Sequence, residues 1–190
     1  MTEFKSVSKS YGSNAVIGGF SLKLPQGSKN VITGASGCGK TTLMRIAAGL
    51  EGCDGGSFVH NGKIAYMFQE TRLLPWKNAL DNIRTVLPKE KFALADKYLS
   101  AVGLADAEKK FPRELSGGMA QRVAFARFLA FAEATEADLL LLDEPFSALD
   151  KETAAKMLEL LKAFSLGKTL LLVTHDEDTA QALGGSVVKL

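Results

Sequence analysis

Residues 34–41, GASGCGKT, form a motif with a specific chemistry. They fit the phosphate-loop pattern G-x-x-x-x-G-K-[ST], after the strand-like NVIT and before a segment with helical spacing. Glycines let backbone N–H groups turn inward around a phosphate, and the start of a helix adds a favourable dipole. Lys40 is long enough to reach the terminal phosphates, and the Thr41 hydroxyl suits Mg²⁺. The motif predicts a nucleoside triphosphate site; the alternative is an ordinary glycine turn, which the flanking strand and helix disfavour.

Two acids end the apolar run LLLLDEP, residues 139–145. An acid at the end of a buried strand is placed to hold the Mg²⁺ shell, and Asp143 is the candidate. Glu144 follows directly, where a carboxylate could polarise an attacking water. The alternative is a solvated strand end, which the phosphate loop in the same chain makes the weaker interpretation.

A second glycine device lies in LSGGMAQR, residues 115–122. Ser116, Gly117 and Gly118 precede a helix-forming segment, so free N–H groups and a hydroxyl would point outward at a helix start and form an anion site. A plain N-cap by Ser116 is the alternative, and it explains the serine but not the glycines. The chain's own phosphate loop already surrounds one face of its nucleotide. The second device is therefore expected to close over the nucleotide of another copy.

The elements that must position these motifs follow from the hydrophobic pattern. Strand and helix alternate in the second half of the chain, which predicts a parallel sheet with crossover helices. Helices are expected in the segments TTLMRIAAGL (closing at Gly49 and Gly52), KFALADKYLSAV (closing at Gly103), VAFARFLAFA and KETAAKMLELLKAF. The pattern of residues 75–120 predicts a helical insertion. A chain of this length is expected to form one domain.

Several short motifs occur in a diagnostic order. They are Tyr11, Gln69 in MFQE, LSGGMAQR, LLLLDEP, SALD at residues 147–150, and His175 in VTHD. The chain thereby resembles the ATP-binding-cassette (ABC) ATPases over essentially its whole length, and LSGG with the following Gln-Arg is the most specific element. The resemblance implies an α/β fold, with a P-loop NTPase (RecA-like) core, an N-terminal antiparallel β subdomain and a small helical insertion. It divides the single ATP-binding domain, residues 1–190, into a β subdomain plus core (1–74 and 121–190) and a helical subdomain (75–120).

The resemblance also implies roles for individual residues. Tyr11 would stack on adenine, unless it is an ordinary strand aromatic. Gln69 would approach Mg²⁺ and the attacking water, His175 would contact the γ-phosphate beside Glu144, and Asp150 would lie where two nucleotide domains meet. Catalytic roles are implied for Glu144, His175 and Gln69, and Mg²⁺ contacts for Thr41, Gln69 and Asp143. ATP contacts are implied for Tyr11, Gly34, Ser36, Gly37, Cys38, Gly39, Lys40, Thr41, Thr42, Ser116, Gly117, Gly118 and Asp150.

The stretch after Gln69, ETRLLPWKNALDNI, resembles the nitrate, aliphatic sulfonate and taurine importer group. In that group the region lines a groove that receives a short helix of the membrane subunit. Leu73, Leu74 and Trp76 are the candidates for this contact, and packing of Trp76 within the helical subdomain is the alternative. The chain departs from the family pattern in a shortened helical segment, residues 82–99, and in Cys38, which stands where serine is common.

Composition limits the partners and the cellular location that we expect for this protein. A formal charge of +2 gives no reason to expect nucleic acid as a partner, and no apolar stretch approaches the roughly 20 residues that span a bilayer. We therefore expect a cytoplasmic protein without a signal peptide or an appended regulatory domain. The resemblance implies that it is peripheral on the inner face of the cell membrane, and that its partners are a second copy in a head-to-tail dimer, permease subunits and a solute-binding protein.

The predicted function is ATP hydrolysis that powers the import of a small solute, with ATP and Mg²⁺ as cofactors. A soluble ABC ATPase in a non-transport assembly is the alternative. An inactive regulatory cassette is disfavoured, because Lys40, Asp143, Glu144 and His175 are all present.

Overall fold

The computed structural model describes residues 1–190. Its strands are β1 (Thr2–Tyr11), β2 (Asn14–Leu24), β3 (Lys29–Thr33), β4 (Gly55–His60), β5 (Ile64–Met67), β6 (Leu139–Asp143), β7 (Thr169–Val173) and β8 (Ser186–Lys189). Its α-helices are α1 (Lys40–Ala47), α2 (Ala79–Arg84), α3 (Ala93–Ala101), α4 (Gly117–Thr135), α5 (Lys151–Phe164) and α6 (Glu177–Leu183). Short 3₁₀ turns lie at Lys89–Lys91, Ala105–Ala107 and Pro112–Glu114. None of the helices has both the length and the apolar character needed to cross a membrane.

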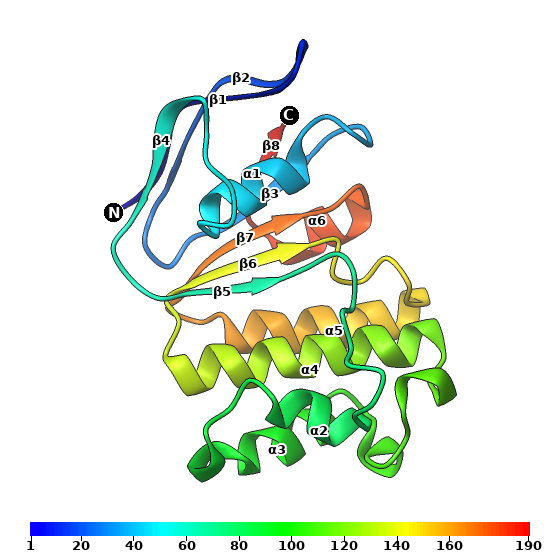
Figure 1. The fold of residues 1–190 in the computed structure, drawn as a ribbon. Coiled ribbons are helices and arrows are strands. Elements are labelled where there is room, and N and C mark those ends of the chain that lie inside the picture. Colours follow the sequence, from blue (N-terminus) through cyan, green and yellow to red (C-terminus); the bar gives the residue numbers. More distant parts are fainter.

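Two sheets form the frame of the molecule (Figure 1). An antiparallel sheet has the order β2-β1-β4, and a five-stranded sheet has the order β5-β6-β7-β3-β8 with all its pairings parallel. Helix α1 packs between the two sheets, and α4 and α5 cover the other face of the parallel sheet. The predicted parallel sheet with crossover helices and the predicted N-terminal antiparallel sheet are confirmed.

The central strands explain why the sequence has continuous apolar runs. Every residue of β6 and of β7 is buried, because helices cover both faces of the sheet. Leu139 and Leu141 pack with α1 and the antiparallel sheet, whereas Leu140 and Leu142 pack with the helices on the other face. In register, Asp143 lies opposite Val173 at the carboxyl ends of the two strands. The residues that follow β3, β6 and β7 therefore meet at one edge, where ligands bind in open α/β sheets.

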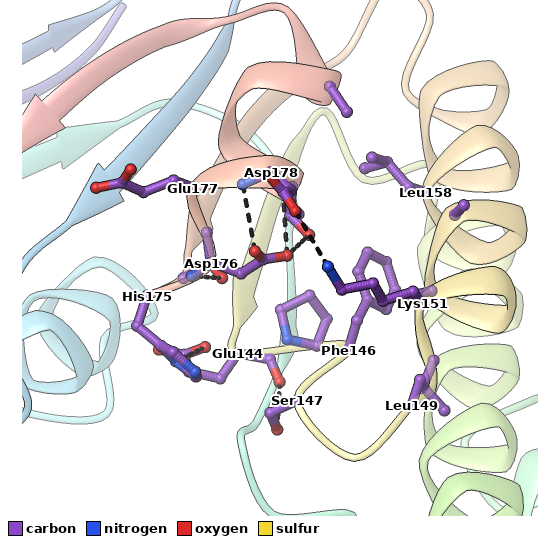
Figure 2. Close-up of a pocket in the computed structure, with 16 residues that line it drawn as sticks. Glu144, Phe146, Ser147, Leu149, Lys151, Leu158, His175, Asp176, Glu177 and Asp178 are labelled. Atoms are coloured by element: carbon purple, nitrogen blue, oxygen red, sulfur yellow. Dashed lines mark hydrogen bonds and ion pairs between the residues drawn. The ribbon is translucent and has the colours of Figure 1, made fainter.

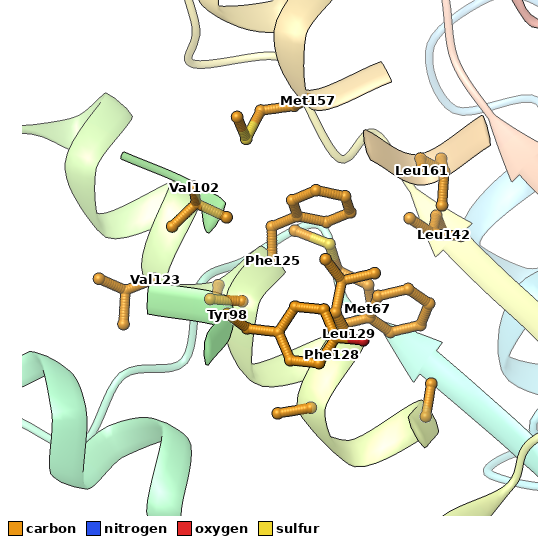
Figure 3. Close-up of a cluster of buried hydrophobic side chains, with 14 of the residues drawn as sticks. Met67, Tyr98, Val102, Val123, Phe125, Phe128, Leu129, Leu142, Met157 and Leu161 are labelled. Carbon is orange, nitrogen blue, oxygen red and sulfur yellow. The ribbon is translucent and has the colours of Figure 1, made fainter. Parts of the chain in front are cut away.

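The helical part shares a core with the sheet. In Figure 3, Tyr98 and Val102 from the α3 region lie beside Phe125 and Phe128 of α4. These side chains belong to one buried cluster of 32 residues that also includes Leu142 of the sheet. Helix α4 begins inside the range 75–120 and continues to Thr135 beneath the sheet. The boundaries of a helical subdomain at 75–120 therefore stay a prediction.

Helix ends follow local chemistry. Gly49 and Gly103 have φ values of 69° and 71°, and they end α1 and α3 where the sequence predicts. Helix α6 was not among the expected helices. Its signal is Asp176, whose carboxylate accepts from the backbone N–H groups of Asp178 and Thr179. Gly184, at a φ of 70°, ends it.

Candidate functional site

A cavity of about 550 Å³ opens at the carboxyl edge of the parallel sheet. Its lining comes from the phosphate loop and from segments far apart in the sequence. The residues are Tyr11, Val16, Ser36, Gly37, Gly39, Lys40, Thr41, Thr42, Gln69, Asp143, Glu144 and His175. Every one of these except Val16 is a residue that the sequence predicts for the site. The fold therefore brings together the phosphate loop, the two acids, the glutamine and the histidine.

The phosphate loop needs glycine at Gly39, which precedes α1. Gly39 has a φ of 104°, and a Cβ there would lie 3.0 Å from Val16 Cγ1 and 3.1 Å from the Val16 carbonyl oxygen. No side chain caps α1, so the N–H groups of its first turn remain available to a ligand. The Lys40 side chain folds back on the loop, and its Nζ donates to the carbonyl oxygens of Gly34 and Ala35 at 2.8 Å each.

Asp143 has the environment of a cation ligand. The residue is 1% exposed, and its Oδ1 has no hydrogen-bond partner. Burial raises the pKa of its carboxyl, the Thr41 hydroxyl opposes that rise, and the neighbouring charge of Glu144 adds to it. A buried, unpartnered carboxylate oxygen beside a hydroxyl fits a hard divalent cation, which takes oxygen ligands and stabilises the ionised carboxylate.

Glu144 and His175 are paired across the ends of β6 and β7. His175 Nδ1 lies 2.9 Å from Glu144 Oε2 (Figure 2). Glu144 is buried, yet its φ of 48° is in the left-handed region, which a non-glycine residue occupies only when its surroundings hold it there. Its N–H donates to the carbonyl of Val173, so the amide of Glu144 still belongs to the sheet. The arrangement is a carboxylate oriented by an imidazole next to a phosphate loop.

Tyr11 and Gln69 lie at the rim of the cavity. The Tyr11 ring is 48% exposed, and its hydroxyl donates to Glu51. The ring lines the cavity, so stacking of Tyr11 on a ligand stays a prediction. Gln69 is exposed and lines the same cavity. Its amide is thus within the space where a ligand would sit.

The second glycine device lies outside this cavity. Ser116, Gly117 and Gly118 are absent from the lining, and Ser116 Oγ accepts from the Met119 N–H at 3.2 Å. Ser116 therefore does cap α4, while Gly117 faces open space. Asp150 is exposed and caps α5 through Thr153, whose hydrogen bonds lower the pKa of the Asp150 carboxyl. Within one chain, the structure does not bring these residues to the phosphate loop.

Comparison with known proteins places this geometry in a family. Residues 17–147 match the family described as ABC transporter. The chain belongs to the ABC transporter family. It is 45% identical over 190 residues to an aliphatic sulfonates import ATP-binding protein, SsuB, of Ralstonia nicotianae, covering 95% of this chain and 66% of that protein. It is 43% identical to SsuB 2 of Agrobacterium fabrum, covering 95% of this chain and 72% of the relative. The chain thus spans about two thirds of the length of these relatives.

Solved ABC cassettes have the same fold. The dimeric structure of a post-hydrolysis state of the cassette MJ0796, bound to ADP and Pi, superposes with a TM-score of 0.89 at 29% identity, covering 100% of this chain and 94% of that one. A second dimeric structure of MJ0796 gives a TM-score of 0.85 at 28% identity, with the same coverage. The predicted family and the predicted cassette fold are confirmed.

Some contacts in this ABC chain were not predicted from the sequence. The Gln121 amide donates to the carbonyls of Glu144 and Pro145, at 3.3 and 2.8 Å. The Tyr66 hydroxyl donates to Asp143 Oδ2 at 3.4 Å, and burial raises the pKa of that phenol. Gln121 lies in LSGGMAQR, residues 115–122, whose turn at residues 116–118 we call the signature turn and whose helix α4 we call the signature helix. No signal in the sequence identifies the partners of Gln121. The Tyr66 contact follows from the pairing of β5 with β6.

A second cavity of about 530 Å³, drawn in Figure 2, lies next to the first. It lies between α5, α6 and the turn after β6, and it shares Glu144 and His175 with the first. Leu149 and Leu158 line its α5 side, and Lys151 Nζ lies 3.7 Å from the Asp178 carboxylate. Glu144 and His175 therefore lie between the two cavities and line both of them.

The remaining histidine lies elsewhere. His60 has its ring nitrogens 2.9 Å from Thr2 Oγ1 and 3.3 Å from Asp138 Oδ1. Asp138 directly precedes β6, so this contact is at the amino end of the parallel sheet, opposite the phosphate loop. His60 links the two sheets and takes no part in the site.

Proposed function

We propose that this chain is the ATP-hydrolysing subunit of an ABC importer, which dimerises on ATP to drive uptake of a small solute. One observation carries the proposal: the 2.9 Å contact between Glu144 and His175 lies in the cavity that the phosphate loop lines. A base oriented by a second side chain, next to a phosphate cradle, is what attack of water on a γ-phosphate requires.

In the proposed reaction, water attacks the γ-phosphorus, the bond to the β,γ-bridging oxygen breaks, and ADP and phosphate leave. Glu144 accepts a proton from the attacking water, and His175 holds the carboxylate and contacts the γ-phosphate. Lys40 exchanges its two loop carbonyls for phosphate oxygens, which pair better with an ammonium group. Bound Mg²⁺, held by Thr41, Asp143 and Gln69, would neutralise charge that develops on the phosphate oxygens.

The exposed signature turn supports an active site that is shared between two copies. Ser116 and Gly117 face solvent rather than their own phosphate loop, and the similar MJ0796 cassettes are dimeric. In the proposed head-to-tail dimer, each signature turn closes over the nucleotide in the other copy's cavity. Asp150, exposed beside the Glu144 turn, would lie at the contact between the copies.

The proposed partners are permease subunits at the inner face of the membrane, in a system with a solute-binding protein. Trp76 is 69% exposed, which favours a docking role over packing, whereas Leu73 packs against the core. The loop that presents Trp76 is held by Asn82, whose side chain bonds to the N–H and C=O groups of Leu74. The relatives named as aliphatic sulfonates import proteins support a sulfonate as the solute. Nitrate and taurine stay in the proposed class because of the resemblance of residues 70–83 to that importer group.

ATP turnover by the purified chain tests the enzymatic part of the proposal. Glu144→Gln should lower turnover at least about 100-fold, leave ATP affinity within threefold and accumulate an ATP-bound dimer on a sizing column, because the carboxylate acts only on water. Glu136→Gln is a matched control, since Glu136 shares the left-handed backbone (φ 56°) but is exposed at the end of α4. Turnover by Glu144→Gln within a few-fold of the parent would refute the assignment.

Growth of the source organism tests the transport part. Deletion of the gene, or its replacement by the Trp76→Glu variant, should abolish growth on a sulfonate, taurine or nitrate as sole sulfur or nitrogen source. Growth on sulfate and ammonium should persist, and Trp76→Glu should keep the ATPase rate of the isolated chain. Unchanged growth on every one of these nutrients would favour the non-transport assembly.

A further inference from the structure

One face of α4 packs on the turn that carries Glu144. Gly118 approaches so closely that a Cβ there would lie 3.3 Å from the Ala148 carbonyl oxygen. Phe125, seven residues on, meets Phe146 edge to face with ring centroids 5.5 Å apart. Gln121 stands between them at helical spacing, so these side chains line one stripe of α4. The signature helix and the turn after β6 are therefore in direct contact within one chain.

Gln121 is the polar contact in this stripe. The residue is 4% exposed, and its amide nitrogen donates to two successive carbonyls, those of Glu144 and Pro145. The Ser147 hydroxyl also donates to the Glu144 carbonyl, at 3.2 Å. Since the left-handed backbone of Glu144 is intrinsically disfavoured, these donors hold it in the conformation that directs its carboxylate to His175.

We propose that Gln121 is a positioning residue. Through it, the orientation of the Glu144 carboxylate depends on the position of helix α4 in the same chain. The inference rests on the proposed function. Gln121 follows Ser116 and Gly117 by about one helical turn, so a shift of the signature turn moves the Gln121 amide with it. When the signature turn closes on the nucleotide of a second copy, α4 is held, and Gln121 holds the Glu144 backbone. When α4 shifts away, the hydrogen bonds from Gln121 are lost, the Glu144 carboxylate is no longer held toward His175, and ATP hydrolysis in the cavity of that chain stops.

The test compares Gln121→Met with the matched control Gln181→Met, which makes the same change at an exposed position of α6. Gln121→Met keeps the length and burial of the side chain but removes the donor. It should lower kcat at least about 10-fold, while the Kd for ATP and the ATP-driven dimerisation of a Glu144→Gln background stay within twofold. The control should keep the parental kcat.

A second comparison separates positioning from a general structural role. In a Ser116→Arg background, which blocks closure by the second copy, Gln121→Met should lower the residual rate less than twofold, because the coupled state no longer forms. Equal losses in both backgrounds, or a kcat of Gln121→Met within twofold of the parent, would overturn the proposal. A folded Gln121→Met chain whose Kd for ATP rises by as much as its kcat falls would also overturn it.

Two further results keep the outcomes distinct. If Gln121→Met does not fold, Gln121→Asn takes its place, since it keeps a neutral amide that is one methylene too short to reach both carbonyls; it should show the same fall in kcat at unchanged Kd. If the parent chain itself hydrolyses no ATP while it binds ATP, the proposed function fails. The Gln121 inference fails separately, when the parent is active and the variant equals it.

Discussion

The chain contains two glycine-rich helix starts that are built differently. Before α1, the left-handed Gly39 brings no capping side chain, and the neighbouring Lys40 is buried with its ammonium group on loop carbonyls. Before α4, Ser116 caps the helix with its own hydroxyl, and Gly117 is exposed. The first start lines a cavity of the same chain, and the second faces solvent. The two starts therefore differ in what they offer a ligand: one has its first-turn N–H groups uncapped inside a cavity, and the other is capped by a hydroxyl and exposed.

Removal of the Lys40 ammonium group, at the start of α1, should have the largest effect of the changes considered. Lys40→Met should lower ATP affinity at least about 100-fold, because a charge-assisted contact to phosphate is lost from a partly desolvated site. Lys63→Met, at an exposed position before β5, is the control and should leave affinity unchanged. Titration with a fluorescent ATP analogue measures both. An affinity within threefold of the parent would break the distinction between the two starts.

Blocking the second start should leave binding intact. Ser116→Arg should keep the ATP affinity of the isolated chain within twofold, yet lower turnover at least about 10-fold by preventing closure of a second copy over the nucleotide. Ser100→Arg, on an exposed position of α3, should change neither. Sedimentation of the variants in a Glu144→Gln background reports the dimer. A normal ATP-driven dimer of Ser116→Arg would contradict the shared site.

A glycine-to-alanine substitution at each helix start should change the free energy of unfolding by different amounts. Gly39→Ala should destabilise the chain by about 1–3 kcal/mol, because a left-handed backbone and the close Val16 carbonyl both reject a Cβ. Gly117→Ala should change stability by less than about 1 kcal/mol, because Gly117 begins a helix and a Cβ there meets open space. Urea unfolding without nucleotide gives both values, and equal losses would contradict the structural difference.

The contributions of the Asp143 and Asp150 carboxylates to folding stability should change in opposite directions with pH. The pKa of Asp143 is raised above the ordinary value of 3.8 by burial, so the unfolded chain ionises first and folding stability falls as pH rises through the interval between the two pKa values. Without nucleotide and divalent cations, Asp143→Asn should therefore stabilise the chain at pH 7 by about 0.5–2 kcal/mol, with the gain vanishing in acid. Asp150→Ala should destabilise it, since hydrogen bonds lower the pKa of Asp150 and its contribution is present at neutral pH. Thermal unfolding at several pH values measures both, and a destabilising Asp143→Asn would contradict the expected sign.

The sequence predicts much of the site because its motifs are contiguous and stand at element ends. GASGCGKT identifies the cradle, and two apolar strands of a parallel sheet bring Asp143, Glu144 and His175 to the same edge. Gln121 could not be assigned in this way, because its partners are backbone carbonyls whose direction is set by the left-handed turn at Glu144. The exposure of Trp76 likewise depends on tertiary packing, and the sequence left both of its interpretations open.

Glu144 is hydrogen-bonded through its backbone both to the parallel sheet and to helix α4. The N–H of Glu144 is bonded to Val173 in the sheet, and its carbonyl is bonded to Gln121 on α4. Only the φ and ψ torsions of Glu144 separate these two anchors. A shift of α4 against the sheet that kept both hydrogen bonds would have to change the φ and ψ of Glu144, and it would thereby turn the carboxylate within the cavity that the phosphate loop lines. The two hydrogen bonds that hold Glu144 in its left-handed conformation therefore also connect a contact at the start of α4 to the orientation of the carboxylate.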